Sequence, residues 1–121
     1  MLGTNDVFLP QGITAHYAAA GVGVLADMVQ VSVAGPGDTA PAVLVVAPPP
    51  LAAMIEFDPA GPTALAESRL FSEAFRRMCS ERGLTLVDLD GVVESSPVDG
   101  VHFDPAGHQA IGAAVAAALQ A

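Results

Sequence analysis

A carboxylate and an imidazole lie three residues apart near the end of the chain, in the segment Asp99-Gly100-Val101-His102. In a short loop, this spacing lets the Asp99 carboxylate turn back and accept a hydrogen bond from Nδ1–H of His102. The carboxylate would fix the tautomer of the ring and leave Nε2 free to take a proton from a nucleophile. With eight aspartates and three histidines in the sequence, such a pair arises by chance roughly one time in five. The spacing alone therefore favours an exposed turn aspartate beside a surface histidine.

A second polar segment, Gly3-Thr4-Asn5-Asp6, lies at the start of the chain. The side-chain amide of Asn5 could donate a hydrogen bond to an oxyanion that develops during acyl transfer. It could equally hold its own loop through an Asx-turn, which is the commoner role of an asparagine beside an aspartate. The residue type leaves both roles open.

Short apolar segments that precede turns or polar residues are the expected strands. They are the strand end Met1–Leu2, the continuous run Val43–Ala47, and Leu84–Asp88. The run Val43–Ala47 is typical of a strand buried on both faces, as in a parallel sheet, and the prolines that follow it end the ladder.

Helical spacing of apolar residues separates these strands. Helices are expected from about residue 13 to 33, from Thr63 or Ala64 to Arg82 with Gly83 as the stop, and after Asp104, which would cap a helix that has Pro105 in its first turn. Loops are expected over 3–11, 51–62 and 89–103. This alternation predicts an α/β domain with a parallel sheet, in which both polar segments lie at the carboxyl side of the strands.

The two polar segments, in this order and at this separation, resemble blocks of the SGNH (GDSL-like) hydrolase family, in its arylesterase and acyltransferase branch. Met1–Asp6 is similar to the third block of the family, Val98–Phe103 to the fifth, and Val43–Leu51 to a core strand and its loop. The resemblance covers nearly the whole chain, so residues 1–121 are expected to be the carboxy-terminal portion of one esterase domain. It implies a partial three-layer α/β/α, flavodoxin-like fold without its amino-terminal strands. An unrelated α/β domain, such as a response-regulator-like fold, would explain the alternation but not both polar segments.

The resemblance also implies roles for individual residues. Asn5 would be an oxyanion-hole donor, Asp99 would orient the histidine, and His102 would be the general base of a carboxylic ester hydrolase or acyltransferase. The reaction would act on a small-molecule ester and need no metal or organic cofactor. His108 is expected to cap or pack in the last helix, and His16 matches no catalytic block.

The nucleophile of the family is missing from this sequence. Its first block, Gly-Asp-Ser, holds the catalytic serine, and no serine here follows Gly-Asp; Ser95 and Ser96 are nearest to His102 but share its loop. We therefore expect a piece of a longer hydrolase that is inactive alone. The alternatives are a split protein and a non-catalytic remnant or interaction module on the same scaffold. With Val43–Ala47 left nearly at an edge, the chain alone is expected to be unstable, molten or oligomeric.

The composition limits the kinds of partner that we expect for this protein. The net charge is −9, and the only basic residues are four arginines within one predicted helix, so a nucleic-acid partner is not expected. No run approaches the ~18 uncharged apolar residues of a membrane span, and no signal peptide is visible, which would make the protein cytoplasmic if Met1 is its true start. The single cysteine, Cys79, cannot form an internal disulfide and is expected to be buried.

Overall fold

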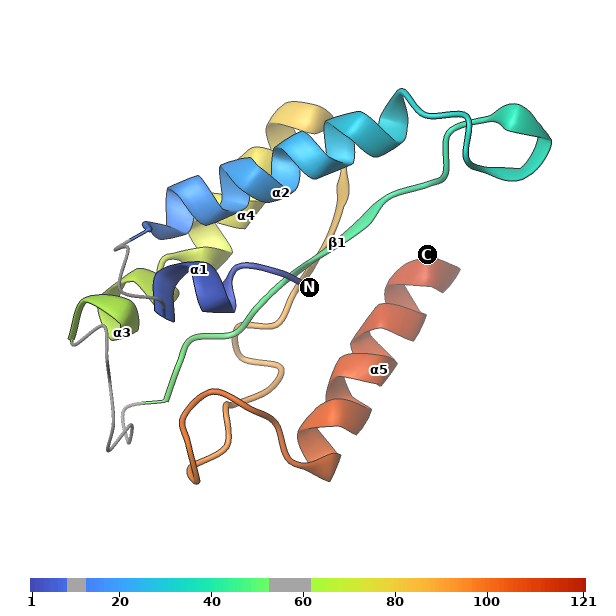
Figure 1. The fold of residues 1–121 in the computed structure, drawn as a ribbon. Coiled ribbons are helices and arrows are strands. Elements are labelled where there is room, and N and C mark those ends of the chain that lie inside the picture. Colours follow the sequence, from blue (N-terminus) through green and yellow to red (C-terminus); the bar gives the residue numbers. More distant parts are fainter. Residues whose placement is uncertain (9–12, 53–61) are drawn as a thin grey trace.

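A two-stranded parallel sheet lies at the centre of the chain in a computed structural model that describes residues 1–8, 13–52 and 62–121 (Figure 1). Strand β1 (Leu44–Ala47) pairs with β2 (Thr85–Asp88), with Leu44 opposite Thr85 and Ala47 opposite Asp88. Both strands were expected from the sequence, and each begins one residue later than predicted. Their parallel pairing confirms the α/β fold class.

Helices cover the sheet on two sides, which gives three layers (Figure 1). Helices α2 (Ala15–Gln30) and α4 (Phe71–Arg82) pack against each other on one face, and α5 (Pro105–Gln120) packs on the other. The side chains of β1 divide between these layers because successive residues of a strand point to opposite faces. One buried cluster contains Val45 and Ala47 with residues of α2 and α4, whereas Leu44 and Val46 pack on the cluster beneath α5.

The helix ends follow the capping residues of the sequence. Thr14 caps α2 by accepting a hydrogen bond from the backbone N–H of Tyr17 at 3.3 Å, so the helix begins at Ala15; it ends at Gln30, within the predicted span of 13–33. A single 3₁₀ turn, η1 (Pro36–Asp38), follows it. Gly83 ends α4 in the left-handed conformation with φ 63°, which confirms the predicted stop. The burial of Cys79 is also confirmed.

The start of the chain differs from the prediction. Met1 and Leu2 form no strand, because they pair with no strand in the part of the chain that the structure describes. The expected loop over 3–11 begins instead with a short helix, α1 (Thr4–Phe8). Gly3 precedes this helix with φ 119°, a backbone conformation that favours glycine. Glycine also avoids a close contact at this position, since a Cβ there would lie 3.3 Å from the ring of Phe75.

The long helix predicted up to Arg82 is two helices, α3 (Pro62–Ser68) and α4. The buried hydroxyl of Ser68 accepts a hydrogen bond from the backbone N–H of Leu51 at 3.0 Å and donates to the carbonyl of Leu65 at 2.9 Å. The hydrogen bond between Leu51 and Ser68 therefore ties the end of α3 to the loop after β1. Most of the loop predicted over 51–62 lies outside the described residues.

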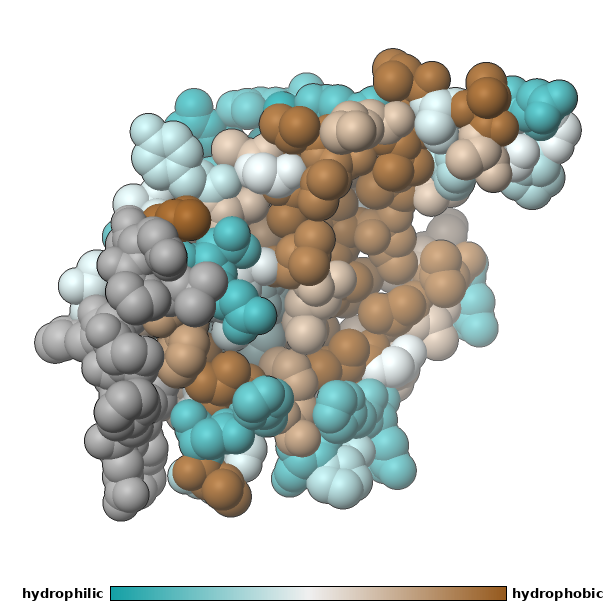
Figure 2. Space-filling model, in the orientation of Figure 1, coloured by the Kyte–Doolittle hydropathy of each residue, from teal (hydrophilic) through white to brown (hydrophobic). Residues whose placement is uncertain are grey.

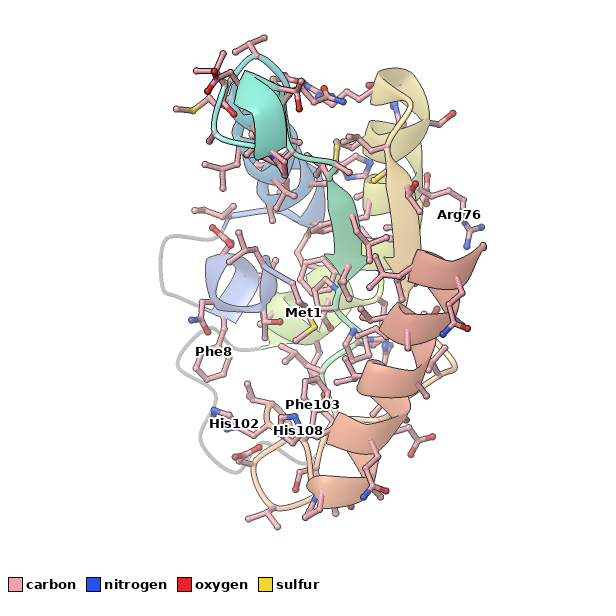
Figure 3. The ribbon with its side chains drawn as sticks, turned by 90° about the vertical axis from the view of Figure 1, so that its right-hand side faces the viewer. Met1, Phe8, Arg76, His102, Phe103 and His108 are labelled. Carbon is pink, nitrogen blue, oxygen red and sulfur yellow. The ribbon has the colours of Figure 1, made fainter. Side chains whose placement is uncertain are left out.

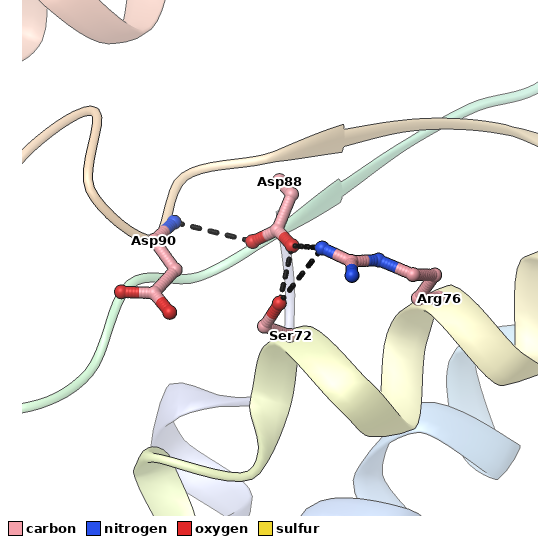
Figure 4. A network of polar contacts seen from close by, with 4 residues as sticks. All are labelled: Ser72, Arg76, Asp88 and Asp90. Carbon is pink, nitrogen blue, oxygen red and sulfur yellow. Dashed lines mark hydrogen bonds and ion pairs between the residues drawn. The ribbon is translucent and has the colours of Figure 1, made fainter.

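A polar cluster at the carboxyl end of β2 ties this strand to α4 (Figure 4). Asp88 accepts hydrogen bonds from the Ser72 hydroxyl and, at 3.0 Å, from the Arg76 guanidinium, and its other oxygen accepts the backbone N–H of Asp90 at 3.1 Å. Both carboxylate oxygens of Asp88 thus have hydrogen-bond partners within the protein, which indicates a structural role for this cluster.

In the described part of the chain, no helix is long and apolar enough to cross a bilayer.

Candidate active site

The Asp99 carboxylate and the His102 ring are in direct contact. Asp99 Oδ2 lies 2.7 Å from Nδ1 of His102, while Oδ1 accepts the backbone N–H groups of Val101 and His102, both at 2.9 Å. An ionised carboxylate can only accept hydrogen bonds, so Nδ1 must carry the proton that joins the two groups. Nε2 is then the unprotonated nitrogen of the neutral ring, as a general base requires.

These contacts also keep the carboxylate charged. The backbone N–H of His102, followed by that of Val101 and by the hydrogen bond from the His102 ring, lowers the pKa of Asp99 from 3.8 to about 2. Asp99 is exposed, so the effect comes from hydrogen bonding to the charged form and not from burial of an ion pair. The carboxylate therefore remains ionised throughout the pH range in which an imidazole can act as a base.

Hydrogen bonds within the loop hold the two residues in place. The backbone N–H of Ser96 donates to the carbonyl of His102 at 2.6 Å, and that of Gly100 donates to the carbonyl of Ser96 at 2.8 Å. Gly100 has φ 72°, a conformation that favours glycine. Two further bonds tie the loop to the segment after β1, from Ala52 N–H to the carbonyl of Gly100 at 2.9 Å and from the Ser95 hydroxyl to the carbonyl of Pro50 at 3.2 Å.

The first turn of α5 fixes the residues that follow His102. Asp104 caps this helix by accepting the backbone N–H of Gly107 at 2.7 Å, which confirms the predicted cap. Phe103 packs on the buried cluster beneath α5, and the ring of His108 meets it edge-on with the ring centroids 5.9 Å apart. Figure 3 shows His102, Phe103 and His108 gathered near the start of α5. His108 thus packs within the helix and does not cap it.

A pocket of about 290 Å³ brings the two polar segments of the sequence together. One wall is the start of the chain, which includes Thr4, Asn5 and Asp6, and the other is the loop and helix that carry His102 and His108. Asn5 and His102, which come from opposite ends of the sequence, therefore line one pocket, and Asp99 contacts the ring of His102. Thr4, Asp6 and Phe103, for which the sequence predicted no role in a site, also line the pocket.

The other candidate residues lie elsewhere. His16 is exposed on α2 and lines a different hollow, beside Arg77 and Met78. Ser95 also lines a separate hollow, next to Pro50. Within residues 1–8, 13–52 and 62–121, no three histidine, cysteine or carboxylate side chains are grouped closely enough to hold a metal ion.

Residues 1–110 match the family model described as the GDSL-like lipase/acylhydrolase family. The chain belongs to this family. The match includes both walls of the pocket, and it confirms the resemblance seen in the sequence. No protein with a curated functional description matches the sequence significantly.

Several solved structures share the fold. A protein of Agrobacterium tumefaciens strain C58 assigned as an arylesterase is 36% identical with a TM-score of 0.85, and 98% of this chain covers 57% of it. The aryl esterase of M. smegmatis is 32% identical with a TM-score of 0.79, and Est24, a carbohydrate acetylesterase of Sinorhizobium meliloti, is 28% identical with a TM-score of 0.80; 98% of this chain covers 56% of each. This chain therefore spans little more than half the length of the relatives that it resembles.

Proposed function

We propose that this chain carries the Asp–His pair and one oxyanion donor of a carboxylic ester hydrolase. Asp99 orients the ring, His102 is the general base, and Asn5 holds the oxyanion. The observation that carries the proposal is the 2.7 Å contact between Asp99 and Nδ1 of His102, at a pocket that Asn5 also lines. The arylesterases and the carbohydrate acetylesterase among the structural relatives support this class of reaction.

The proposed reaction transfers an acyl group in two steps. A serine hydroxyl attacks the ester carbonyl while Nε2 of His102 takes its proton, and the Asn5 amide donates to the oxygen that becomes negative. The imidazolium then gives the proton to the departing alcohol. Water, or an acceptor alcohol in a transferase, cleaves the acyl-serine by the same route in reverse.

The nucleophile in this proposal comes from polypeptide outside the sequence. The hydroxyl of Ser95 is buried and donates to the carbonyl of Pro50, and that of Ser96 accepts the backbone N–H of Val98 at 3.2 Å. Both hydroxyls therefore have structural partners, Ser95 in the segment after β1 and Ser96 within its own loop. The Gly-Asp-Ser block of the family is the expected source of the missing serine.

The test compares this chain with an extended chain, in which Met1 is preceded by the segment of the M. smegmatis aryl esterase that carries the Gly-Asp-Ser block. We expect p-nitrophenyl acetate hydrolysis by the extended chain and none by the chain alone. His102→Ala should remove the activity, and His16→Ala is the matched control because His16 is an exposed histidine outside the pocket. An active His102→Ala variant would rule out the role given to His102. A folded but inactive extended chain would favour the non-catalytic module.

A further inference from the structure

A carboxylate outside the proposed catalytic pair lines the pocket that Asn5 and His102 share. Asp6 directly follows Asn5 in α1 and is half-buried, and it forms no ion pair with the described residues. Figure 2 shows hydrophilic side chains over α1 and again at the start of α5, the elements that carry Asp6 and His108. A half-buried carboxylate without a basic partner attracts a cation more strongly than one in bulk water does.

The basic residues of the chain do not offset the charge of Asp6. The sequence contains no lysine, and its four arginines all lie within residues 69–82, so none of them lines the pocket. Asp99 places a second carboxylate at this site through its 2.7 Å contact with the ring of His102. With a net charge of −9 on the whole chain, these groups make the electrostatic potential at the pocket negative, which attracts a positively charged ligand and repels an anion.

The proposed reaction places the alcohol part of the ester near these charges. Asn5 binds the carbonyl oxygen, and Nε2 of His102 gives its proton to the departing alcohol, so the alcohol part lies in the pocket that Asp6 lines. Val101 and Phe103 line the same pocket and offer apolar surface to the carbon groups that surround a charge. The volume of about 290 Å³ is close to the lower limit of small-molecule sites, which suits a compact alcohol.

We infer that Asp6 is a specificity-determining residue that favours esters of compact, positively charged alcohols. This inference rests on the proposed esterase function, because it concerns the substrate of the same site. Asp6 acts on the choice of substrate, whereas the proton transfers remain with His102 and its partner Asp99.

The test compares two esters of nearly the same shape, acetylcholine and its uncharged analogue 3,3-dimethylbutyl acetate. The extended chain is assayed for acetate release at about pH 8, where free imidazole is neutral. The readout is the ratio of the two kcat/KM values, because a general loss of activity cancels in this ratio. Asp6→Asn should lower the ratio for acetylcholine over its analogue at least about threefold, as expected of one partly screened charge contact.

Asp38→Asn is the matched control for this substitution. Asp38 is an exposed carboxylate in η1 and does not line the pocket, so it changes the net charge equally without changing the site. The ratio should therefore stay within about 1.5-fold of the wild-type value. Adding about 0.5 M NaCl to the wild type should lower the ratio by screening, which tests the charge contact without any substitution.

Binding is measured separately from hydrolysis. NMR titration of the extended chain with the two product alcohols, choline and 3,3-dimethyl-1-butanol, gives Kd values that do not require a reaction. Choline should bind at least about threefold more weakly to Asp6→Asn than to the wild type, while the Kd of the uncharged alcohol should change less than about twofold.

The outcomes separate this inference from the proposed function. Hydrolysis of both esters with a ratio that Asp6→Asn leaves unchanged overturns the inference and leaves the esterase role standing. Choline binding that depends on Asp6, in a folded chain that hydrolyses neither ester, supports the cation subsite and contradicts the esterase role. An equal fall of the ratio in Asp6→Asn and Asp38→Asn overturns the inference, because the effect would then belong to the net charge. A chain that neither hydrolyses the esters nor binds choline overturns both.

Discussion

Replacing Asp99 by asparagine should reverse the tautomer of His102. One oxygen of Asp99 accepts two backbone N–H groups at 2.9 Å, from Val101 and His102, while the other faces Nδ1 at 2.7 Å. In Asp99→Asn the two backbone donors require the amide oxygen, so the NH₂ group must face the ring. Nδ1 then has to accept a hydrogen bond, which puts the ring proton on Nε2. A ring protonated on Nε2 cannot take a proton from a serine.

The expected size of the effect follows from this change of tautomer. The corresponding replacement in another serine hydrolase lowers kcat by about 10⁴-fold without disturbing the geometry. We expect a loss on the order of 10³–10⁴ in kcat for p-nitrophenyl acetate in the extended chain, with a small change in KM, since the carboxylate supports the ring behind the pocket. Nitrogen-15 NMR of the imidazole should show protonation at Nδ1 in the wild type and at Nε2 in Asp99→Asn.

Asp104→Asn is the matched control for this experiment. Asp104 is another carboxylate close to His102, but it caps α5, and asparagine caps helices about as well as aspartate. Its kcat should therefore remain within about twofold of the wild-type value. If Asp99→Asn keeps more than a tenth of the wild-type kcat, or if its Nδ1 stays protonated, the reasoning from the two backbone donors is wrong.

Three further predictions concern stability and pH. Gly21→Ala should stabilise the extended chain by about 0.5–1 kcal/mol in urea unfolding, because Gly21 lies in a helix and a Cβ there meets nothing within 4 Å. Gly23→Ala should give almost none of this gain, since its Cβ would lie 2.8 Å from the guanidinium of Arg82. The new methyl group would displace the partly exposed ion pair between Arg82 and Asp27, which is worth about 0.2–1 kcal/mol. An equal gain at both positions would contradict this reasoning. Ser68→Ala should lower the free energy of unfolding by about 1–3 kcal/mol, because it leaves the buried backbone N–H of Leu51 unpaired. A loss below about 0.5 kcal/mol in the same unfolding assay would show that this hydrogen bond does not stabilise the fold. Asp99 should titrate near pH 2 by carbon-13 NMR. Because its pKa is lower in the folded than in the unfolded chain, its contribution to the free energy of unfolding is complete above about pH 4 and is lost as the pH falls through 2. A titration midpoint near pH 4 would show that the backbone hydrogen bonds to Asp99 are absent in solution.

Features that depend on neighbours along the chain could be predicted from the sequence. The positions of β1 and β2, the cap of α5 at Asp104 and the stop at Gly83 follow from residue type and local backbone geometry. The contact between Asp99 and His102 belongs to the same group, because three residues of loop are enough to bring the carboxylate to the ring. The family resemblance also rested on short local blocks, and the family match over residues 1–110 confirms it.

Features that depend on contacts between distant segments could not be predicted in this way. No spacing could show that Asn5 faces the same pocket as His102, since this requires the start of the chain to lie against the loop before α5. The hydrogen bond that joins Ser68 to Leu51 at the break between α3 and α4 is another contact between distant segments, which residue spacing does not show. The segment Met1–Leu2 has the apolar character of a strand, but strand pairing is a long-range contact and no strand lies beside it among the described residues. Local preferences select helices, turns and caps, whereas pockets, strand edges and helix breaks depend on which surfaces the whole chain brings together.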